Sequence, residues 1–419
     1  MHNLKNEALT ITKNAFIAAK IAQKLDAITK NKVLQEVKNQ ILQQQENIIK
    51  FNQIDIKNAI DNGIDQAKID RLKLDTNKIQ AIAASIDEII LKDDPVGKVI
   101  FETNRANGLN IKRVTTPIGV MLAIYESRPN VTVDVAALAI KSGNVAILRC
   151  GSEAVNSSKI FADIFQIALI NNNLDKNIIS FCDNTERALI KYLLRMDKYI
   201  DVVIPRGGKS LILAITKNTR IPVFKHLDGN CHTYIHEDAD FEKARKILIN
   251  AKMRRVSICG ATESLLIDKK IAAKILPLII NDLNDLGCEI RADALSCKID
   301  PRLKKAKIKD YYTEYLDKII SLKIVKNIDE AINHIEKYGS SHTESIVTEN
   351  NLAAQKFLNE VNSAIIMHNS STQFADGGEF GFGAEVGIAT GKLHARGPIG
   401  LEQLTTFKYQ VSANCAIRQ

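Results

Sequence analysis

The sequence predicts an α/β protein with a Rossmann-type domain, and three observations support this fold class. From Gly119 onward, short runs rich in valine and isoleucine alternate with stretches of helical periodicity. Such alternation is typical of a parallel sheet with helices on both faces. The 419 residues are enough for two or three domains. The composition, 45% apolar and 25% charged, is that of a globular chain and excludes a disordered or fibrous one.

The part of the chain before Gly119 is expected to form helices and a hairpin. Apolar residues recur at three- and four-residue spacing over 4–60, and a further helix is expected over 77–90. Pro95-Val96-Gly97 ends the helical pattern. Residues 98–116 are typical of β-strands, with Asn107-Gly108 as the hairpin turn. This hairpin is too polar for a core, and we expect an extended arm.

The alternation after Gly119 predicts the elements of two α/β blocks. In the first block we expect strands at 120–125, 145–149, 178–181 and 202–204, helices at 131–141, 156–170 and 185–194, and a further strand starting at Val223-Phe224-Lys225. In the second block, about 226–370, we expect helices at 239–252, 269–285 and 328–337. A glycine-studded loop region follows over 371–400, and 404–412 returns to a β pattern.

Charge and apolar runs limit the function classes. The net charge is +9, but the lysines are interleaved with acidic residues, which favours solvated helix faces over a nucleic-acid-binding surface. A basic nucleic-acid-binding scaffold stays an alternative, as does use of a few cations for small anionic ligands. No apolar run approaches the ~18 residues needed to cross a bilayer. The first residues lack the apolar core of a signal peptide. We therefore expect a cytoplasmic protein without membrane or nucleic-acid partners.

The cysteines point to reduced thiols, one of which is a candidate nucleophile. The seven cysteines are an odd number without a Cys-x-x-Cys pair, so neither a zinc ribbon nor a disulfide framework is expected. Cys259 follows Lys252, Arg254 and Arg255, and nearby cations favour the nucleophilic thiolate. An inert buried cysteine is the alternative. His232 and His236 lie too far apart on an expected strand to share a metal, so we expect no metal site.

Three further segments are candidates for ligand contacts. Pro205-Arg206-Gly207-Gly208-Lys209-Ser210 lies between a strand and a helix, where backbone N–H groups can approach a phosphate, although a simple tight turn fits equally well. Arg149 ends another expected strand, where it could meet a ribose phosphate. The glycine-dense run 376–387 is either a flexible loop or one that covers substrate or cofactor.

Blocks of sequence spread from about residue 95 to the end of the chain carry a resemblance to a known family. They are Pro117-Ile118-Gly119-Val120, Tyr125-Glu126-Ser127-Arg128-Pro129-Asn130-Val131-Thr132, Lys141-Ser142-Gly143-Asn144, Ile204-Pro205-Arg206-Gly207-Gly208, His226-Leu227-Asp228-Gly229-Asn230-Cys231-His232, Thr313-Glu314-Tyr315-Leu316, the glycine run and Lys392-Leu393-His394-Ala395-Arg396-Gly397-Pro398. Together they resemble the γ-glutamyl phosphate reductase family of the aldehyde dehydrogenase superfamily.

The resemblance implies an activity and its chemistry. It implies reduction of L-glutamyl 5-phosphate to L-glutamate 5-semialdehyde and phosphate with NADPH, in proline biosynthesis. Cys259 falls where the superfamily has its nucleophile, and it would form a thioester as phosphate leaves. Asn130 or the backbone N–H of Cys259 would stabilise the oxyanion. Ordinary aldehyde dehydrogenases have a glutamate base where this chain has 226–230, and its absence suits an enzyme that must not hydrolyse its thioester.

The same resemblance implies binding residues. Arg149 would lie near the adenosine ribose, Gly207 and Gly208 near the pyrophosphate, and Glu314 at the nicotinamide ribose. The expected substrate contacts are Ser341, His342 and Thr343. Two departures from the family pattern bear on substrate affinity: Gly260 stands where asparagine is usual, and Gln373 where arginine is usual.

The resemblance also implies domains and partners. We expect an NADP-binding domain (1–103 and 118–225, with part of 371–401), a catalytic domain (226–370), and a β-arm for oligomerisation (104–117 and 402–419). A homo-oligomer is expected, and the upstream glutamate kinase is a candidate partner. The enzymatic alternative is a general or CoA-acylating aldehyde dehydrogenase, and the non-enzymatic one is the basic scaffold named above.

Overall fold

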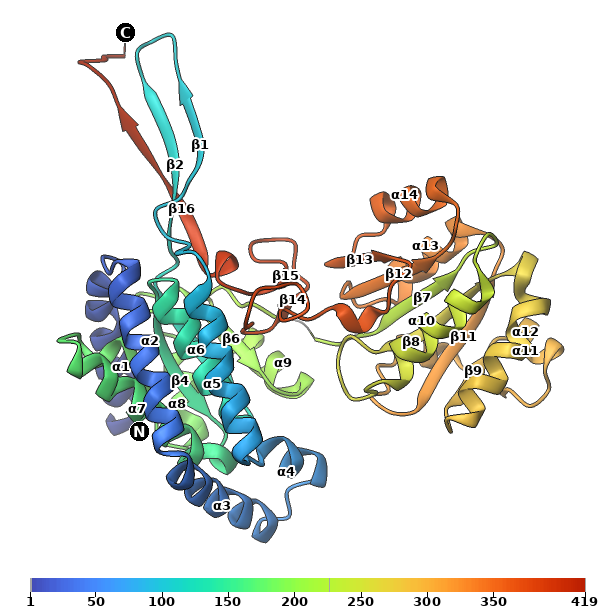
Figure 1. Ribbon diagram of the computed structural model, residues 1–419, viewed down its shortest axis with the longest axis horizontal. Helices are drawn as coiled ribbons and strands as arrows, with labels where there is room; N and C mark the ends of the chain where they lie inside the picture. Colours follow the sequence, from blue (N-terminus) through green and yellow to red (C-terminus); the bar gives the residue numbers. More distant parts are fainter. Residues whose placement is uncertain (1, 226, 419) are drawn as a thin grey trace. The chain divides into compact units, whose positions relative to one another are not determined.

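The chain forms two compact units. The computed structural model describes residues 2–225 and 227–418. Unit 1 comprises Met1–Lys225, Gly381–Ile388 and Ile399–Gln419, and unit 2 comprises His226–Phe380 and Ala389–Pro398 (Figure 1). The glycine-dense run 376–387 therefore passes from unit 2 into unit 1.

Unit 1 is built on a parallel sheet. Its strands are β3 (Val120–Tyr125), β4 (Val145–Cys150), β5 (Ile179–Phe181) and β6 (Val202–Arg206). Their order is β5-β4-β3-β6, and all neighbours are parallel. Every residue of β3 and β4 is buried, which explains their continuous apolar sequence. The order reverses between β3 and β6, and in sheets of this kind ligands bind at the carboxyl ends of such strands.

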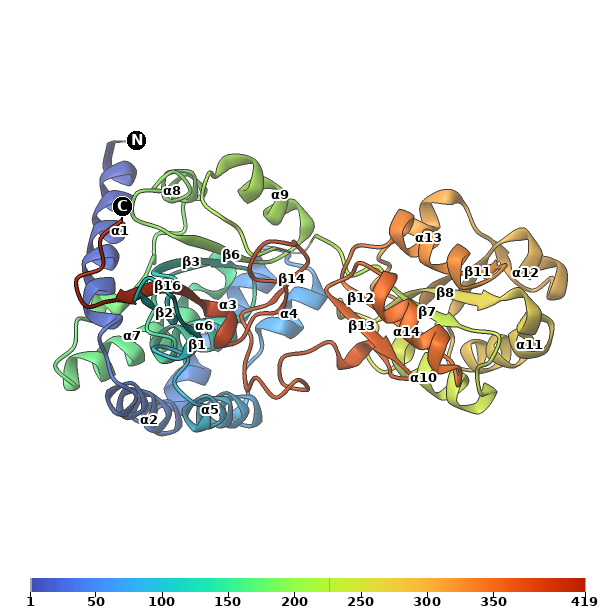
Figure 2. The ribbon, with the colours of Figure 1, turned by 90° about the horizontal axis from the view of Figure 1, so that it is seen from above.

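Helices cover both faces of this sheet. They are α1 (His2–Ala22), α2 (Ala27–Gln43), α3 (Gln45–Asp61), α4 (Gln66–Leu72), α5 (Thr76–Leu91), α6 (Pro129–Lys141), α7 (Val155–Asn171), α8 (Arg187–Leu193) and α9 (Lys209–Asn218). Figure 2 shows α8 and α9 on one side of the sheet and α2, α5 and α7 on the other. The predicted alternation of strands and helices is confirmed here.

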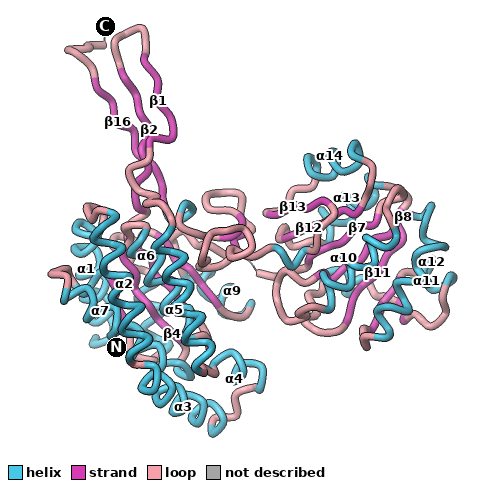
Figure 3. Tube along the Cα trace, viewed as in Figure 1, coloured by secondary structure: helices cyan, strands magenta, loops and turns pink. Residues whose placement is uncertain are grey.

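The expected β-arm is present as an antiparallel sheet that extends from unit 1 (Figure 3). It consists of β1 (Val99–Asn104), β2 (Asn110–Pro117) and β16 (Thr405–Ser412), with β2 in the middle. Gly108 takes a φ of +82° in the turn, as the Asn-Gly signal predicts. The sheet begins at Val99, ahead of the expected boundary at 104. The Arg113 guanidinium lies between the rings of Phe101 and Phe407, at 5.3 and 5.1 Å from their centroids.

Unit 2 is a second parallel sheet with two helical layers. Its strands are β7 (Cys231–Ile235), β8 (Thr262–Asp268), β9 (Glu289–Ala292), β10 (Lys304–Lys305), β11 (Ile319–Val325), β12 (Thr343–Val347) and β13 (Ile365–His368), in the order β10-β9-β11-β8-β7-β12-β13. Its helices are α10 (Phe241–Met253), α11 (Lys269–Asp285), α12 (Ala294–Ile299), α13 (Ile328–Tyr338) and α14 (Asn351–Glu360). Leu265 packs with α10 and α11, whereas Leu266 packs with α13 and α14, as the two-residue repeat of a strand requires.

Two details of the sequence-based expectation need correction. The strand predicted to start at Val223 is wrong: Val223 makes a single bridge to Val203, and the next strand begins at Cys231. Pro222, which lacks an N–H donor, precedes this bridge. Helices α12 and α14 were not anticipated. Over the described ranges, no helix is long and apolar enough to cross a membrane.

Candidate active site

The sheet order of unit 2 brings the predicted nucleophile next to other predicted site residues. Cys259 lies in the turn before β8, the Gly229 segment precedes β7, and His342 immediately precedes β12. Glu314 lies in the loop before β11. Because β11, β8, β7 and β12 are neighbours and parallel, these four segments meet at the amino-terminal edge of the sheet.

The backbone of Gly229 lies directly against Cys259. A Cβ added to Gly229 would be 2.2 Å from the carbonyl oxygen of Cys259 and 2.6 Å from its Cα. No side chain fits there, so glycine is required by close approach rather than by backbone dihedral angles. Cys259 itself is half-buried, so its thiol is not sealed in the core. His226, at the start of this motif, lies outside the described residues.

Glu314 is linked to the nucleophile through the same glycine. One of its carboxylate oxygens accepts the Gly229 N–H at 2.8 Å. A charge-assisted hydrogen bond of this kind fixes both partners. The predicted nicotinamide-ribose residue therefore lies beside the predicted nucleophile, one residue of backbone away.

The predicted substrate segment packs beneath Cys259. The Cys231 thiol donates to the Cys259 carbonyl oxygen at 3.1 Å, and the Cys231 sulfur is 3.6 Å from Nδ1 of His342. Nδ1 of His342 is also 2.8 Å from the hydroxyl of Thr343. His342 and Thr343 are fully buried, whereas Ser341 is partly exposed and takes a φ of +60°. Of the three residues, only Ser341 is open to solvent.

Burial separates the two neighbouring cysteines chemically. It raises the pKa of Cys231 well above the ordinary value, because the interior disfavours a thiolate. Cys231 therefore remains a neutral thiol that can donate to the turn. The sequence did not single out Cys231, and only its position in the motif with Gly229 gave a signal.

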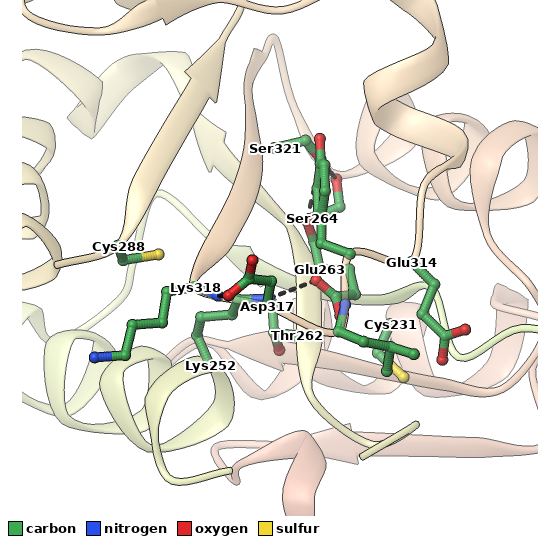
Figure 4. Close-up of polar contacts among 12 residues, drawn as sticks. Cys231, Lys252, Thr262, Glu263, Ser264, Cys288, Glu314, Asp317, Lys318 and Ser321 are labelled. Carbon is green, nitrogen blue, oxygen red and sulfur yellow. Dashed lines mark hydrogen bonds and ion pairs between the residues drawn. The ribbon is translucent and has the colours of Figure 1, made fainter. Parts of the chain in front are cut away.

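A buried ion pair holds the two ends of the turn that carries Cys259. Nζ of Lys252, at the end of α10, is 2.5 Å from the carboxylate of Glu263, on β8, and both side chains are inaccessible to solvent (Figure 4). The other Glu263 oxygen accepts the Leu316 N–H at 3.1 Å. Burial raises the pKa of Glu263 to about 7. Lys252 was expected as a free cation beside the thiol, but its charge is directed to Glu263.

The two departures from the family pattern meet at this turn. A Cβ at Gly260 would lie 3.0 Å from the carbonyl oxygen of Thr372 and 3.7 Å from the Cα of Gln373. The Gln373 amide donates to the carbonyl oxygen of Ala251 at 2.9 Å and accepts from Arg254 at 3.3 Å. A glycine at 260 thus allows the Gln373 segment to pack closely, and Gln373 in turn holds the end of α10.

In unit 1, a cavity of about 390 Å³ lies at the carboxyl ends of the strands. It is lined mainly by the loops after β3 and β4 and by α8 and α9: Ile124, Tyr125, Glu126, Arg149, Gly151, Ser152, Glu153, Thr185, Arg187, Ile190, Lys191, Leu194, Ser210, Leu211, Ala214, Ile215 and Asn218. Gly207 and Gly208 precede α9 beside it, and the Gly208 N–H donates to Glu126 at 3.1 Å. A Cβ at Gly207 would lie 2.6 Å from Leu211, so the turn is closely packed.

Two predicted site residues of unit 1, Arg149 and Asn130, form hydrogen bonds within the protein. Arg149 is 5% exposed, and its guanidinium donates to the carbonyl oxygens of Cys150 and, at 2.6 Å, Thr185. Asn130 lies in the first turn of α6, and its amide donates to Asp134 at 3.0 Å. Burial raises the pKa of Asp134 to about 7. Arg149 lines the cavity but also shapes the loop that leads into α8.

In the part of the chain that the structure describes, no group of three His, Cys, Asp or Glu side chains could hold a metal ion.

Replacing Gly229 with alanine should disrupt the turn, because the added methyl group would overlap the Cys259 backbone. We expect the free energy of unfolding in urea to fall by about 1–3 kcal/mol and alkylation of Cys259 by iodoacetamide, followed by peptide mass spectrometry, to change in rate. Gly391→Ala is the matched control, since nothing lies within 4 Å of a Cβ there. Identical behaviour of the two variants would contradict the close contact.

Replacing Lys252 with methionine should leave Glu263 buried without its partner. We expect a loss of about 3–5 kcal/mol in the free energy of unfolding at pH 8. The exposed Lys270–Glu237 pair, also 2.5 Å apart, provides the control Lys270→Met, which should change the free energy of unfolding far less because water screens an exposed pair.

The pH dependence of that loss has a definite sign. The pKa of Glu263 is about 7 in the folded protein, against an ordinary value of 4.5. Its contribution to stability is therefore complete below pH 4.5 and is lost as pH rises through 7. Lys252 is the main group that lowers this pKa, so Lys252→Met should be less damaging at pH 5 than at pH 8. A pH-independent cost in urea unfolding would argue against the buried pair.

Comparisons with known proteins show the family of the chain. Residues 5–316 match the model of the aldehyde dehydrogenase family. The γ-glutamyl phosphate reductase of Parvibaculum lavamentivorans is 50% identical over 375 residues, 89% of this chain and 88% of the relative. That of Zymomonas mobilis subsp. mobilis is 45% identical over 408 residues, 97% and 95% of the two chains. The crystal structure of γ-glutamyl phosphate reductase from Thermotoga maritima superposes with a TM-score of 0.96 at 41% identity, covering 99% of this chain and 100% of that one. The chain belongs to the aldehyde dehydrogenase family and, within it, to the γ-glutamyl phosphate reductases.

Proposed function

We propose that this protein reduces L-glutamyl 5-phosphate to L-glutamate 5-semialdehyde and phosphate, with NADPH, in proline biosynthesis. The observation that carries the proposal is the turn of Cys259, a partly accessible thiol with the backbone of Gly229 directly behind it. The names of the relatives at 45–50% identity support the substrate.

In this mechanism Cys259 is the nucleophile. Its thiolate attacks the acyl carbon of the substrate, a carbon–sulfur bond forms, and the carbon–oxygen bond to phosphate breaks. Phosphate carries away the electron pair, and a thioester remains on Cys259. The backbone N–H of Cys259 and the amide of Asn130 are the proposed oxyanion donors. Collapse of the reduced intermediate returns the thiolate and releases the aldehyde.

The thioester must survive until it is reduced, and the residue against Cys259 suits this need. Gly229 offers only backbone there, and residues 226–230, where ordinary aldehyde dehydrogenases have a glutamate base that activates water, contain no glutamate. Glu314, the predicted nicotinamide-ribose residue, accepts the Gly229 N–H with one carboxylate oxygen. This arrangement favours transfer to a reductant over hydrolysis, as an acyl-phosphate reductase requires.

The aldehyde dehydrogenase fold implies a nicotinamide cofactor, and unit 1 has residues that fit one. The cavity has apolar walls from α8 and α9 and polar groups at the strand ends. Arg149 would shape its floor, and Gly207 and Gly208 would approach the pyrophosphate. The family resemblance gives Glu314 as the residue for the nicotinamide ribose. When bound, the cofactor supplies hydride to the acyl carbon.

We further infer that the arm joins subunits. β1 and β16 are the edge strands of its sheet, and exposed aromatic side chains, Phe101, Phe407 and Tyr409, lie on them. Edges of this kind pair readily with another chain. A complex with glutamate kinase stays a prediction from the family resemblance.

Replacing Cys259 with alanine should abolish the reverse reaction, in which L-glutamate 5-semialdehyde reduces NADP⁺ and its acyl group is transferred to phosphate. We expect a loss on the order of 10⁴-fold or more in kcat/KM, because the nucleophile is removed. Cys297→Ala is the matched control, as Cys297 is also partly buried in unit 2. Retained activity in Cys259→Ala would contradict the mechanism. Dependence of the wild type on coenzyme A rather than phosphate would favour an acylating aldehyde dehydrogenase.

A further inference from the structure

Two cationic side chains line the cavity of unit 1 and take no part in the chemistry described above. Arg187 and Lys191 lie four residues apart on α8, so they share one face of the helix. Both are exposed. Within 2–225 and 227–418, neither has an ion-pair or side-chain hydrogen-bond partner. They are positioned to meet a ligand at the rim of the cavity.

The acidic residues of the same cavity are already engaged. A Glu153 oxygen accepts both the N–H and the hydroxyl of Ser127, at 2.8 and 2.7 Å. Glu126 accepts the Gly208 N–H. A dinucleotide site that prefers a free ribose 2′-hydroxyl typically offers it a carboxylate, whereas a site for a 2′-phosphate offers arginine. Here the side chains without partners are the cations.

Arg149 contributes to this arrangement by fixing the loop that leads into α8. Its guanidinium donates to the carbonyl oxygen of Thr185, two residues before Arg187. Because Arg149 is buried and bound to two carbonyl oxygens, it cannot turn outward to wrap a phosphate. Phosphate recognition at the rim therefore falls to Arg187 and Lys191.

The walls of the cavity define the rest of the ligand. Ile190 and Leu194 of the α8 side face the cavity, as do Leu211, Ala214 and Ile215 of α9. An apolar slot with cations at its rim fits a flat base joined to a phosphorylated sugar.

We propose that Arg187 and Lys191 bind the ribose 2′-phosphate of NADPH and give this enzyme its preference for NADPH over NADH. The inference rests on the proposed function only in taking the ligand to be a nicotinamide dinucleotide. Arginine presents a planar fork that matches phosphate oxygens, and lysine adds a mobile point charge. NADH carries a hydroxyl at that position and gains nothing comparable from the pair.

The direct test measures binding of adenosine 2′,5′-bisphosphate and of 5′-AMP by calorimetry, without any reaction. In the wild type we expect the bisphosphate to bind more tightly. In Arg187→Ala/Lys191→Ala its affinity should fall by about ten- to a hundredfold, while that of 5′-AMP stays unchanged. Lys217→Ala, an exposed lysine on α9 that does not line the cavity, is the matched control and should behave as wild type.

Steady-state kinetics extend the test. The double variant should show a ten- to hundredfold higher KM for NADPH, with kinetics for NADH unchanged. If the double variant lost equal affinity for the bisphosphate and for 5′-AMP, or lost affinity for neither, the inference would be overturned. If the double variant loses affinity for the bisphosphate but not for 5′-AMP, the cofactor inference stands. If the same wild-type enzyme does not act on glutamate semialdehyde and phosphate, the proposed substrate fails. If the enzyme acts on glutamate semialdehyde and phosphate but the double variant does not weaken binding of the bisphosphate selectively, the cofactor inference fails and the proposed substrate stands.

Discussion

The close approach of Gly229 to Cys259 is the contact on which the site of unit 2 depends. It places the start of β7 against the turn before β8 at a distance that excludes any side chain. The same glycine donates its N–H to Glu314, so one residue positions both the nucleophile and a predicted cofactor ligand. Beneath it, Cys231 reaches the Cys259 carbonyl and His342. Backbone packing, rather than a chain of side-chain bases, gives the turn its shape.

Burial also distinguishes Cys259 from the four buried cysteines, Cys150, Cys182, Cys231 and Cys288. It raises the pKa of Cys150 and Cys182 to about 12 and that of Cys288 to about 11, so these remain thiols in the cores of the two units. These three are buried free cysteines, as the prediction of reduced thiols without a disulfide framework requires. Lys252 and Glu263 balance each other inside unit 2, which leaves Arg254 and Arg255 as the exposed cations near the turn.

Much of the fold followed from local patterns, but the contacts within the site did not. Alternating apolar runs predicted the strands of unit 1, and Asn107-Gly108 predicted the hairpin of the arm, because both signals act over a few residues. The order of the strands in unit 2 is set by long-range packing, which no local pattern encodes. Cys259 was a candidate from its cationic neighbours and from motif resemblance, Glu314 from resemblance alone, and their link through Gly229 could not be foreseen. Arg149 shows the same limit: its position at a strand end was visible in the sequence, whereas its bond to Thr185 was not.

The most direct test of the central claim, that Cys259 carries the acyl group, is intact-protein mass spectrometry of the trapped intermediate. The enzyme is incubated with L-glutamate 5-semialdehyde and NADP⁺ without phosphate, so that the thioester forms and has no acceptor. The account predicts one added glutamyl group per chain, located at Cys259, and its release when phosphate is supplied. A mass unchanged under these conditions, or a glutamyl group on another residue, would contradict it.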